Sequence, residues 1–432
     1  MKFLPNLSEK EGTGSLLLNQ KAKSRLFFLL LLFFLPTQLG LHLWPDFSFV
    51  RGLRVDYLSP TLYFTDVLVI LLVASSPKVF LKLIKALLKY KKFALLAFLF
   101  VFLNIIYSSS PLSSIYYLIK ILEMSALFVF VLKNFGIFRN LIAPIFAIGI
   151  LFESLLAILQ FLKQASINGI FYFFGERFFS LNTPNIAAAS INGELILRPY
   201  ATFSHPNVLA AYILVGTFFI LREVKFKRSA SSIFYFVCLL FGFIAILLTL
   251  SRTPLILYMT SVLFLVFYKK FSPKVLFSFL AGFVGAILFF GQTLFDRFAN
   301  TPILDESFVE RLLLAKVAVK MLYDNLFLGV GLGSFLHELP NYYTGHKYFF
   351  LQPVHNIFLL FGAEGGIIGL ILLILIFVYL FTKTNLSGRA ILLIILALGF
   401  FDHYFLTLQQ GQLLFVLSIA YVASSTKIKR LV

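Results

Sequence analysis

Two arginines stand beside apolar runs, where a charged side chain is costly unless it reaches water or an anion. Arg252 lies in the run Leu247–Pro254, where two apolar stretches meet with almost no loop. Arg198 shortly precedes the polar cluster Ser204-His205-Pro206-Asn207, at the start of another apolar run. A helix N-terminus at this cluster would attract anions. Each arginine could bind an anion or anchor the chain by snorkelling, and Ser204 or His205 could also cap the helix.

His355 supplies a candidate base, because a neutral imidazole can take a proton from a hydroxyl group. It stands with Asn356 at the start of a later apolar run, two residues after Pro353. Asn356 could orient a neighbour or a sugar hydroxyl. The alternative for His355 is an interfacial histidine that caps a helix. The histidines lack the i, i+4 spacing of a helical zinc site, and no acidic residue completes a cluster by sequence, so we expect neither metal nor cofactor.

The composition excludes an ordinary soluble protein. Of 432 residues, 60% are hydrophobic and 13% charged, 56 are phenylalanine, and the mean hydropathy is +0.95. These values are typical of a polytopic helical membrane protein. The single cysteine, Cys238, excludes an intramolecular disulfide and a cysteine metal cluster.

The apolar runs predict an all-α membrane protein with about twelve transmembrane helices. The expected spans are 26–44, 61–76, 93–109, 111–132, 140–162, 205–221, 232–250, 253–268, 275–294, 354–381, 390–408 and 411–425. They form one transmembrane domain, 26–425, between tails at 1–25 and 426–432. Two outer loops, 163–204 and 295–353, are long enough to fold, and the second precedes the tenth helix.

The net charge of +19 is a topology signal on this arrangement. The tails and alternate loops carry more than twice as many Lys and Arg residues as the opposite side, which predicts that both termini are cytoplasmic. Anionic lipid headgroups are plausible partners of these basic loops. No basic face is interleaved with exposed aromatic residues, so a nucleic-acid partner is not expected. All six histidines then fall at or beyond the outer boundary: His42, His205, His337, His346, His355 and His403.

The second outer loop contains two further patterns. Charged residues spaced among apolar ones between Glu306 and Asp324 predict an amphipathic helix, either on the outer leaflet or packed on the bundle. Gly329-Val330-Gly331-Leu332-Gly333-Ser334 superficially looks like a phosphate-binding loop. No strand precedes it and no Lys-Ser or Lys-Thr follows, so we interpret it as a flexible turn.

Four segments taken in order resemble the core of the O-antigen ligase and polymerase superfamily. They are Arg198-Pro199-Tyr200-Ala201-Thr202-Phe203-Ser204-His205-Pro206-Asn207-Val208-Leu209-Ala210, Leu250-Ser251-Arg252-Thr253-Pro254, Gly329–Phe335 and Val354-His355-Asn356. The resemblance spans roughly 190–415. It departs at Ala201 and Thr253, where glycine is common in the family.

The resemblance implies a C-type glycosyltransferase-like fold that acts at the outer face of the bacterial cytoplasmic membrane. The implied donor is a glycan linked to undecaprenyl diphosphate, and the implied pathway is the synthesis of lipopolysaccharide or another cell-surface polysaccharide. Arg198 and Arg252 would bind the donor diphosphate and His355 would be catalytic. We expect His205, Asn207 and Asn356 to contact substrate, with a glycan, lipid or protein acceptor.

Elementary chemistry is compatible with this role. Each guanidinium about 4 Å from a phosphate charge gains roughly 4 kcal/mol at an effective dielectric constant near 20, before desolvation, so two could replace a metal ion. Direct attack by the acceptor hydroxyl would invert the anomeric centre.

Two other functions are alternatives to a glycosyltransferase: a transporter or lipid-glycan flippase, and a structural membrane protein. A transporter would use intramembrane charges, and the candidates are Lys120, Glu123, Glu153 and Glu364.

Overall fold

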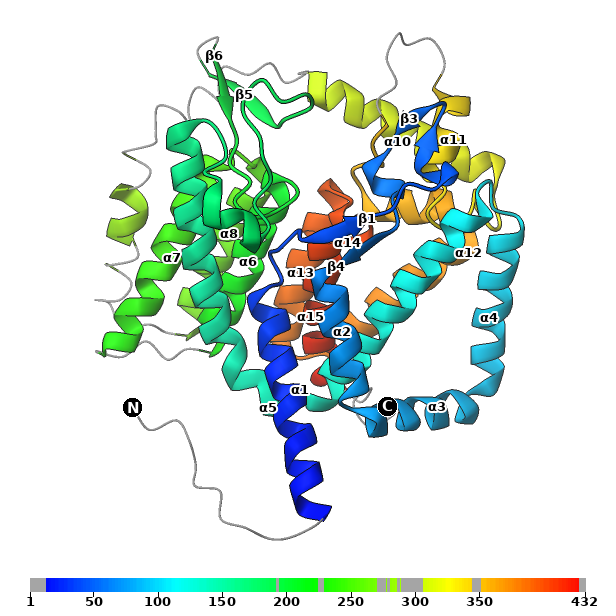
Figure 1. Cartoon of the computed structure of the whole chain (residues 1–432), viewed down its shortest axis with the longest axis horizontal. Coiled ribbons are helices and arrows are strands. Elements are labelled where there is room, and N and C mark those ends of the chain that lie inside the picture. The colour runs from blue at the N-terminus through cyan, green and yellow to red at the C-terminus, as the bar shows by residue number, and fades with distance from the viewer. Residues whose placement is uncertain are drawn as a thin grey trace.

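The computed structural model describes residues 13–191, 194–223, 229–269, 277, 280–285, 288, 306–343 and 351–426. Helices dominate this part of the chain (Figure 1). The helices are α1 (Thr13–Phe33), α2 (Phe64–Ala74), α3 (Pro77–Lys89), α4 (Lys91–Ile106), α5 (Pro111–Lys163), α6 (Pro206–Glu223), α7 (Ala230–Leu248), α8 (Arg252–Lys269), α10 (Glu306–Asp324), α11 (Phe335–Tyr342), α12 (Ile357–Lys383), α13 (Leu386–Phe401), α14 (Tyr404–Thr407) and α15 (Gln409–Ser424). Short strands pair as β1 (Gly40–His42) with β4 (Thr61–Tyr63), β2 (Phe49–Val50) with β3 (Leu53–Arg54), and β5 (Ala188–Ile191) with β6 (Glu194–Leu197).

Four described helices are long and apolar enough to cross a membrane: α5, α6, α7 and α12. Helices α2 and α13 are apolar but shorter. The structure therefore supports a helical membrane protein, while the expected total of twelve spans stays a prediction. Most of the expected span 275–294 lies outside the described residues.

The expected spans 111–132 and 140–162 are joined without a loop, which corrects the prediction of a break between them. They form the 53-residue helix α5, which Figure 1 shows bent into two arms at its lower edge. The connecting residues keep helical hydrogen bonds and bury Phe135 and Phe138. Phe138 packs against Phe28 of α1, with ring centroids 4.4 Å apart. Aromatic packing therefore holds the turn as helix.

The structure differs from the prediction at the end of the first expected span and at the start of the second. Helix α1 stops at Phe33, because Pro36 cannot continue the hydrogen-bond ladder. The chain then extends into β1, and Gly40 pairs with Tyr63 of β4 in antiparallel register. A small sheet therefore replaces the end of the run 26–44 and the start of the run 61–76.

Helix α6 is the centre of the bundle. It is apolar on all sides and largely buried among α5, α7, α8, α13 and α15, as expected for a helix without a solvent or lipid face. Gly216 allows close packing, since a β-carbon there would lie 2.7 Å from the Phe146 ring of α5. The N-terminus of this fixed central helix carries Asn207.

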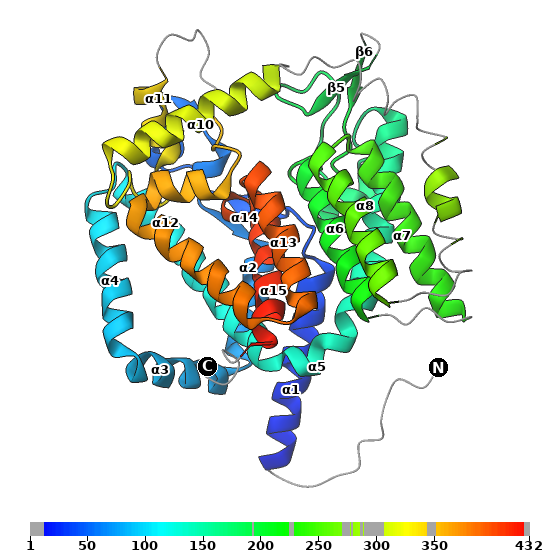
Figure 2. The same cartoon turned by 180° about the vertical axis from the view of Figure 1, so that it is seen from behind.

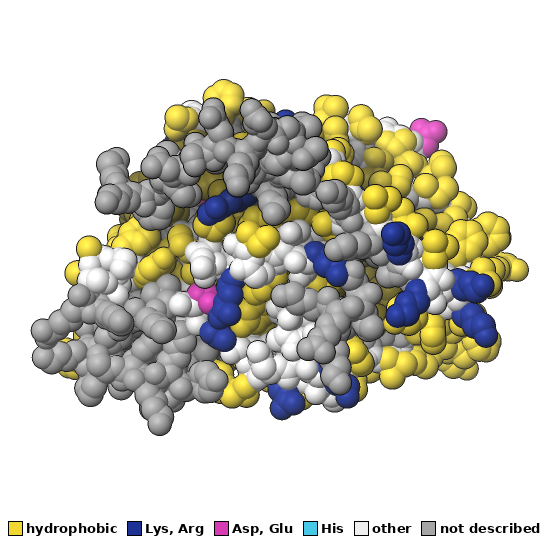
Figure 3. All heavy atoms as spheres, turned by 90° about the horizontal axis from the view of Figure 1, so that it is seen from below, with side chains coloured by type: hydrophobic (Ala, Val, Ile, Leu, Met, Phe, Trp, Pro, Cys, Tyr) yellow, Lys and Arg dark blue, Asp and Glu magenta, His cyan; other side chains and the backbone are white. Residues whose placement is uncertain are grey.

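The upper and lower ends of the molecule, as drawn in Figure 1, differ in the elements and side chains that they carry. The β5–β6 hairpin and α10 lie at the upper end, where α10 runs across the ends of the longer helices, as Figure 2 shows from behind. The amphipathic helix expected between Glu306 and Asp324 is thus confirmed as a helix. The lower end carries scattered Lys and Arg side chains among hydrophobic ones (Figure 3). Helix α3, which holds several of the basic residues expected in a cytoplasmic loop, lies along this lower edge (Figure 1).

Candidate active site

Arg198 is held rigidly at the end of the β5–β6 hairpin. Its Nε donates to the carbonyl oxygen of Thr249 at 2.7 Å. Its Nη2 donates to Asn207 Oδ1 at 2.7 Å and to Ser251 Oγ at 2.9 Å. These bonds orient the guanidinium group before any substrate binds.

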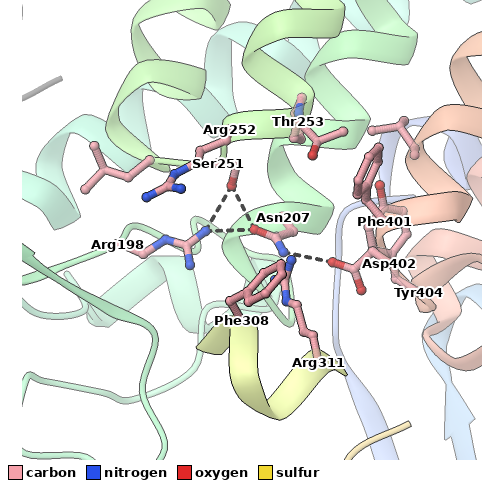
Figure 4. A pocket seen from close by; sticks show the side chains of 13 residues that line it. Arg198, Asn207, Ser251, Arg252, Thr253, Phe308, Arg311, Phe401, Asp402 and Tyr404 are labelled. Carbon is pink, nitrogen blue, oxygen red and sulfur yellow. Dashed lines mark hydrogen bonds between the residues drawn. The ribbon is translucent and has the colours of Figure 1, made fainter. Parts of the chain in front are cut away.

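Arg252 follows the tight turn that the sequence predicted between two helices. Leu250 adopts a left-handed conformation with φ of 52°, and Arg252 is the first residue of α8. Ser251 Oγ donates to Asn207 Oδ1 at 2.8 Å, which ties this turn to α6. Figure 4 shows that the turn presents Arg252 beside Arg198.

A cavity of about 180 Å³, here called the arginine cavity, joins these residues. Its charged and polar lining consists of Arg198, Asn207, Ser251, Arg252, Thr253, Arg311, Asp402 and Tyr404. Arg311 reaches the cavity from α10 together with Phe308 (Figure 4). Three guanidinium groups thus face one carboxylate, an arrangement suited to an anion with more than one charged group.

Asn207 connects the arginines to Asp402. Its Nδ2 donates to Asp402 Oδ2 at 2.8 Å, so its Oδ1 must be the atom that accepts from Arg198 and Ser251. The expected contact of Asn207 with substrate stays a prediction. What the geometry establishes is a bridge that fixes Arg198 relative to Asp402.

Asp402 in turn contacts His355. The Nδ1 atom of His355 lies 3.3 Å from Asp402 Oδ1, which also accepts the backbone N–H of His403 at 2.8 Å. Burial alone would raise the pKa of Asp402, but the hydrogen bond with His355 and the neighbouring histidines hold it well below its usual range. An ionised carboxylate can only accept, so Nδ1 of His355 carries a proton, and in a neutral imidazole Nε2 then has the free lone pair.

His403 completes a cluster that sequence spacing did not reveal. The ligand atoms of His355, Asp402 and His403 all lie within 4.8 Å of one another, close enough to hold a metal ion. The expectation that no acidic residue would complete a histidine cluster was therefore wrong, because Asp402 is 47 residues from His355 in sequence. His403 is nearly fully buried, and burial lowers its pKa to about 3.

Residues 234–374 match the family model described as O-antigen ligase. This stretch is about a third of the chain, and over it the sequence is similar to the O-antigen ligase family. This is an enzyme family, so the resemblance noted in the sequence is confirmed. The matched stretch includes Arg252, Arg311 and His355, while Arg198, Asn207 and Asp402 lie outside it. No curated protein matches the chain.

Two side chains that were expected to contact substrate, Asn356 and His205, make hydrogen bonds within the protein. Asn356 caps α12, since its Oδ1 accepts from the backbone N–H groups of Phe358 and Leu359. Its Nδ2 donates to the carbonyl oxygen of Phe400 at 3.0 Å. His205 Nδ1 accepts from the backbone N–H of Asn207 at 3.1 Å, at the start of α6. These contacts account for both side chains as helix caps, and a further contact with substrate stays a prediction.

The glycine-rich segment is a turn, as expected. Gly329, Gly331 and Gly333 all have positive φ, which residues with a β-carbon rarely adopt. A β-carbon on Gly329 would also lie 2.5 Å from the carbonyl oxygen of Ala363. Gly329 therefore serves close packing against α12, whereas a β-carbon on Gly331 would meet Ser108 and one on Gly333 would meet Tyr117 of α5.

The carboxylates considered for transport have structural partners. Lys120 contacts both Asp66 and Glu123 at 2.8 Å. Glu153 accepts from the backbone N–H and hydroxyl of Thr202. Glu364 accepts from the backbone N–H of Phe335. Each of these carboxylates thus binds a lysine or a group from a segment distant in sequence, which favours a structural role over a place in an ion path.

Proposed function

We propose that this protein is a glycosyltransferase of the O-antigen ligase or polymerase type. It transfers a glycan from undecaprenyl diphosphate to an acceptor hydroxyl at the outer face of the cytoplasmic membrane. The observation that carries the proposal is the arginine cavity, because Asp402 both lines it and contacts His355. The site thus brings a diphosphate-binding group and a proton acceptor to one place.

The arginines bind the donor diphosphate and stabilise it as it leaves. Arg198 and Arg252 present planar guanidinium groups that can each contact two phosphate oxygens. Arg311 adds a third cation from α10. The bonds from Arg198 to Thr249, Asn207 and Ser251 preorganise its charge, so little reorganisation is needed as negative charge develops. The reaction therefore proceeds without a divalent metal.

His355 is the base for the acceptor. The acceptor oxygen attacks the anomeric carbon while the bond from that carbon to the phosphate oxygen breaks, and its electron pair leaves with the diphosphate. The acceptor proton passes to His355 Nε2, and Asp402 stabilises the resulting imidazolium. The 3.3 Å separation between His355 and Asp402 is long for a charged hydrogen bond and is expected to shorten when substrate binds. A single displacement inverts the anomeric centre.

The test uses purified protein in lipid vesicles with a radiolabelled undecaprenyl-diphosphate glycan, and measures donor binding and transfer separately. His355→Ala should bind the donor normally but lose transfer by about a hundredfold to ten-thousandfold. His337→Ala is the matched control, because His337 lies in α11 and does not line the arginine cavity. Near-normal transfer by His355→Ala would remove this residue from the mechanism. Loss of wild-type transfer with a chelator, restored by metal, would contradict the metal-free proposal.

Ligation and polymerisation are distinguished by deleting the gene and examining the glycans of the cell. Single repeat units without longer chains indicate a polymerase. Full-length polymer that stays on its lipid carrier indicates a ligase. Unchanged glycans would contradict both forms of the proposed function.

A further inference from the structure

A second, larger cavity lies beside the His355–Asp402–His403 cluster and has a different chemical character. Its volume is about 700 Å³, within the range of small-ligand sites. Five tyrosines line it, and we call it the tyrosine cavity: Tyr57, Tyr63, Tyr116, Tyr117 and Tyr200. Glutamine side chains add hydrogen-bonding groups to the lining: Gln38, Gln352, Gln409, Gln410 and Gln412.

The two cavities are lined by neighbouring residues of the same two segments. On α6, His205 lines the tyrosine cavity and Asn207 lines the arginine cavity. Beyond α13, Tyr404 lines the arginine cavity and Leu406 begins the stretch that lines the tyrosine cavity. The ring of Tyr57 meets His403 edge-on at 5.5 Å, and His403 lies 5.0 Å from the ring of His355.

The tyrosine cavity is lined by charges of both signs, Arg54, Lys120 and Arg177 against Asp56 and Glu364. Arg177 donates to the carbonyl oxygen of Ser204 at 3.0 Å. Arg54 pairs with Asp56 at 3.7 Å. Lys120 is neutralised by Asp66 and Glu123. Neutral amides and aromatic faces therefore dominate the chemistry available to a ligand. Tyrosine rings stack on the apolar faces of sugars, and amides exchange hydrogen bonds with sugar hydroxyl groups.

Gln409 carries a hydrogen-bond acceptor that the protein leaves unused. Its side chain is 3% exposed, and its Nε2 donates to Thr65 Oγ1 and to Asp66 Oδ1. The Asp66 carboxylate can only accept, so the amide cannot be turned around. Among the described residues, Gln409 Oε1 then has no hydrogen-bond partner. A buried acceptor without a partner is costly, and a sugar hydroxyl in the cavity would satisfy it.

We propose that the tyrosine cavity binds the sugar rings of a glycan substrate, with Gln409 Oε1 accepting from a sugar hydroxyl and Tyr63 stacking on a ring. This rests on the proposed function and deepens it, because it assigns the sugars to a cavity next to the one that binds the diphosphate. The glycan comes either from the acceptor or from the donor's own chain, and the same sugar chemistry serves both.

The single tryptophan gives a direct readout. Trp44 stacks on His42, which lines the tyrosine cavity, at a centroid distance of 5.8 Å. The guanidinium group of Arg54, another lining residue, lies 4.4 Å from the Trp44 ring centroid. Because the chain has no other tryptophan, its emission reports on this cavity. A ligand that moves His42 or Arg54 should change the emission.

The probe is the cell's own lipid-linked glycan after mild acid has released it from the lipid diphosphate. Titration of the purified full-length protein should change Trp44 emission with saturation. Gln409→Met and Tyr63→Leu should each weaken the apparent affinity about tenfold, the loss expected for one buried interaction. Tyr107→Leu is the matched control, because Tyr107 is 69% exposed and lines neither cavity. Thermal unfolding of each variant shows whether it is folded.

Two further experiments are needed. The first distinguishes failure of this proposal from failure of the proposed function, and the second distinguishes acceptor glycan from donor glycan. Arg252→Ala should keep the glycan response even though it loses transfer, so the sugar site can stand if the proposed function fails. With the arginine cavity saturated by intact donor, a persisting response assigns the site to the acceptor glycan, whereas competition assigns it to the donor glycan. No saturable response, or a response equally strong in folded Gln409→Met and Tyr63→Leu, would overturn the proposal.

Discussion

At the scale of single residues, Arg252 tests whether diphosphate recognition depends on shape as well as charge. Arg252→Lys keeps one positive charge but loses the planar fork that contacts two phosphate oxygens. We expect transfer to fall by about tenfold or more, equivalent to roughly 1.4 kcal/mol, in vesicles with labelled donor. Arg139→Lys is the control, since Arg139 pairs with Glu223 away from the cavity. Wild-type transfer by Arg252→Lys would contradict bidentate recognition.

The lowered pKa of His403 predicts a loss of stability in acid. An unfolded chain protonates this histidine below pH 6.5, whereas the folded protein does so near pH 3. The unfolded state therefore binds more protons between these values, and stability falls as the pH drops through that window. At pH 5 the cost is about 2 kcal/mol, at 1.36 kcal/mol for each pKa unit.

His403→Gln removes the group that titrates. We expect thermal unfolding in detergent to show a smaller decrease in midpoint between pH 7.5 and pH 5 for this variant than for the parent protein. The comparison within each protein cancels any general loss of stability from the substitution. An equal decrease in both proteins would show that His403 does not cause the acid sensitivity.

The candidate site was only partly predictable at this scale, for a physical reason. Arg198, Arg252 and His355 stand out because charged or titratable residues next to apolar runs are costly. Arg311 carries no such local signal. Asp402 stands inside the apolar run 390–408, but its contact with His355 was not predictable because the two residues are 47 apart in sequence. Ala201 shows the same limit: its φ of 49° explains why glycine suits this position, and no pattern in one sequence reveals a backbone angle.

At the scale of elements, α10 brings a third guanidinium group to the arginine cavity. Arg311→Ala should raise the donor KM about tenfold with a smaller effect on kcat, because the loss is mainly of charged binding contacts. Lys316→Ala on the same helix is the matched control, being exposed and lining neither cavity. Equal donor KM values in both variants would exclude α10 from donor binding.

Hydrophobic runs predicted the existence of most helices better than their ends. The run 232–250 corresponds closely to α7, and 411–425 to α15, because an apolar stretch of that length fits one helix. The predicted break between the runs 111–132 and 140–162 was wrong. The residues between them include charged side chains, but they stay helical because Phe138 packs against Phe28 of α1. The small β1–β4 sheet depends on pairing between distant segments, which hydropathy does not record.

At the scale of the whole molecule, function depends on which end faces outward. The arginine cavity receives α10 from the upper end in Figure 1, whereas basic side chains are scattered over the opposite end in Figure 3. Positive residues favour the cytoplasmic side, so the arginine cavity should open toward the outer leaflet. A lipid-linked diphosphate could then reach the arginines from the membrane while its glycan stays in water.

Cysteine labelling tests this orientation. In a Cys238→Ala background, cysteines replacing Ser190 in β5 or Asn341 in α11 should react with an impermeant maleimide added to intact spheroplasts. A cysteine replacing Ser229, the N-cap of α7 at the opposite side of the predicted topology, should react only after the membrane is permeabilised. All three positions are exposed, so differences in labelling reflect the membrane and not burial in the protein. Labelling of Ser229→Cys alone in intact spheroplasts would place the arginine cavity at the cytoplasmic face and contradict transfer at the outer surface.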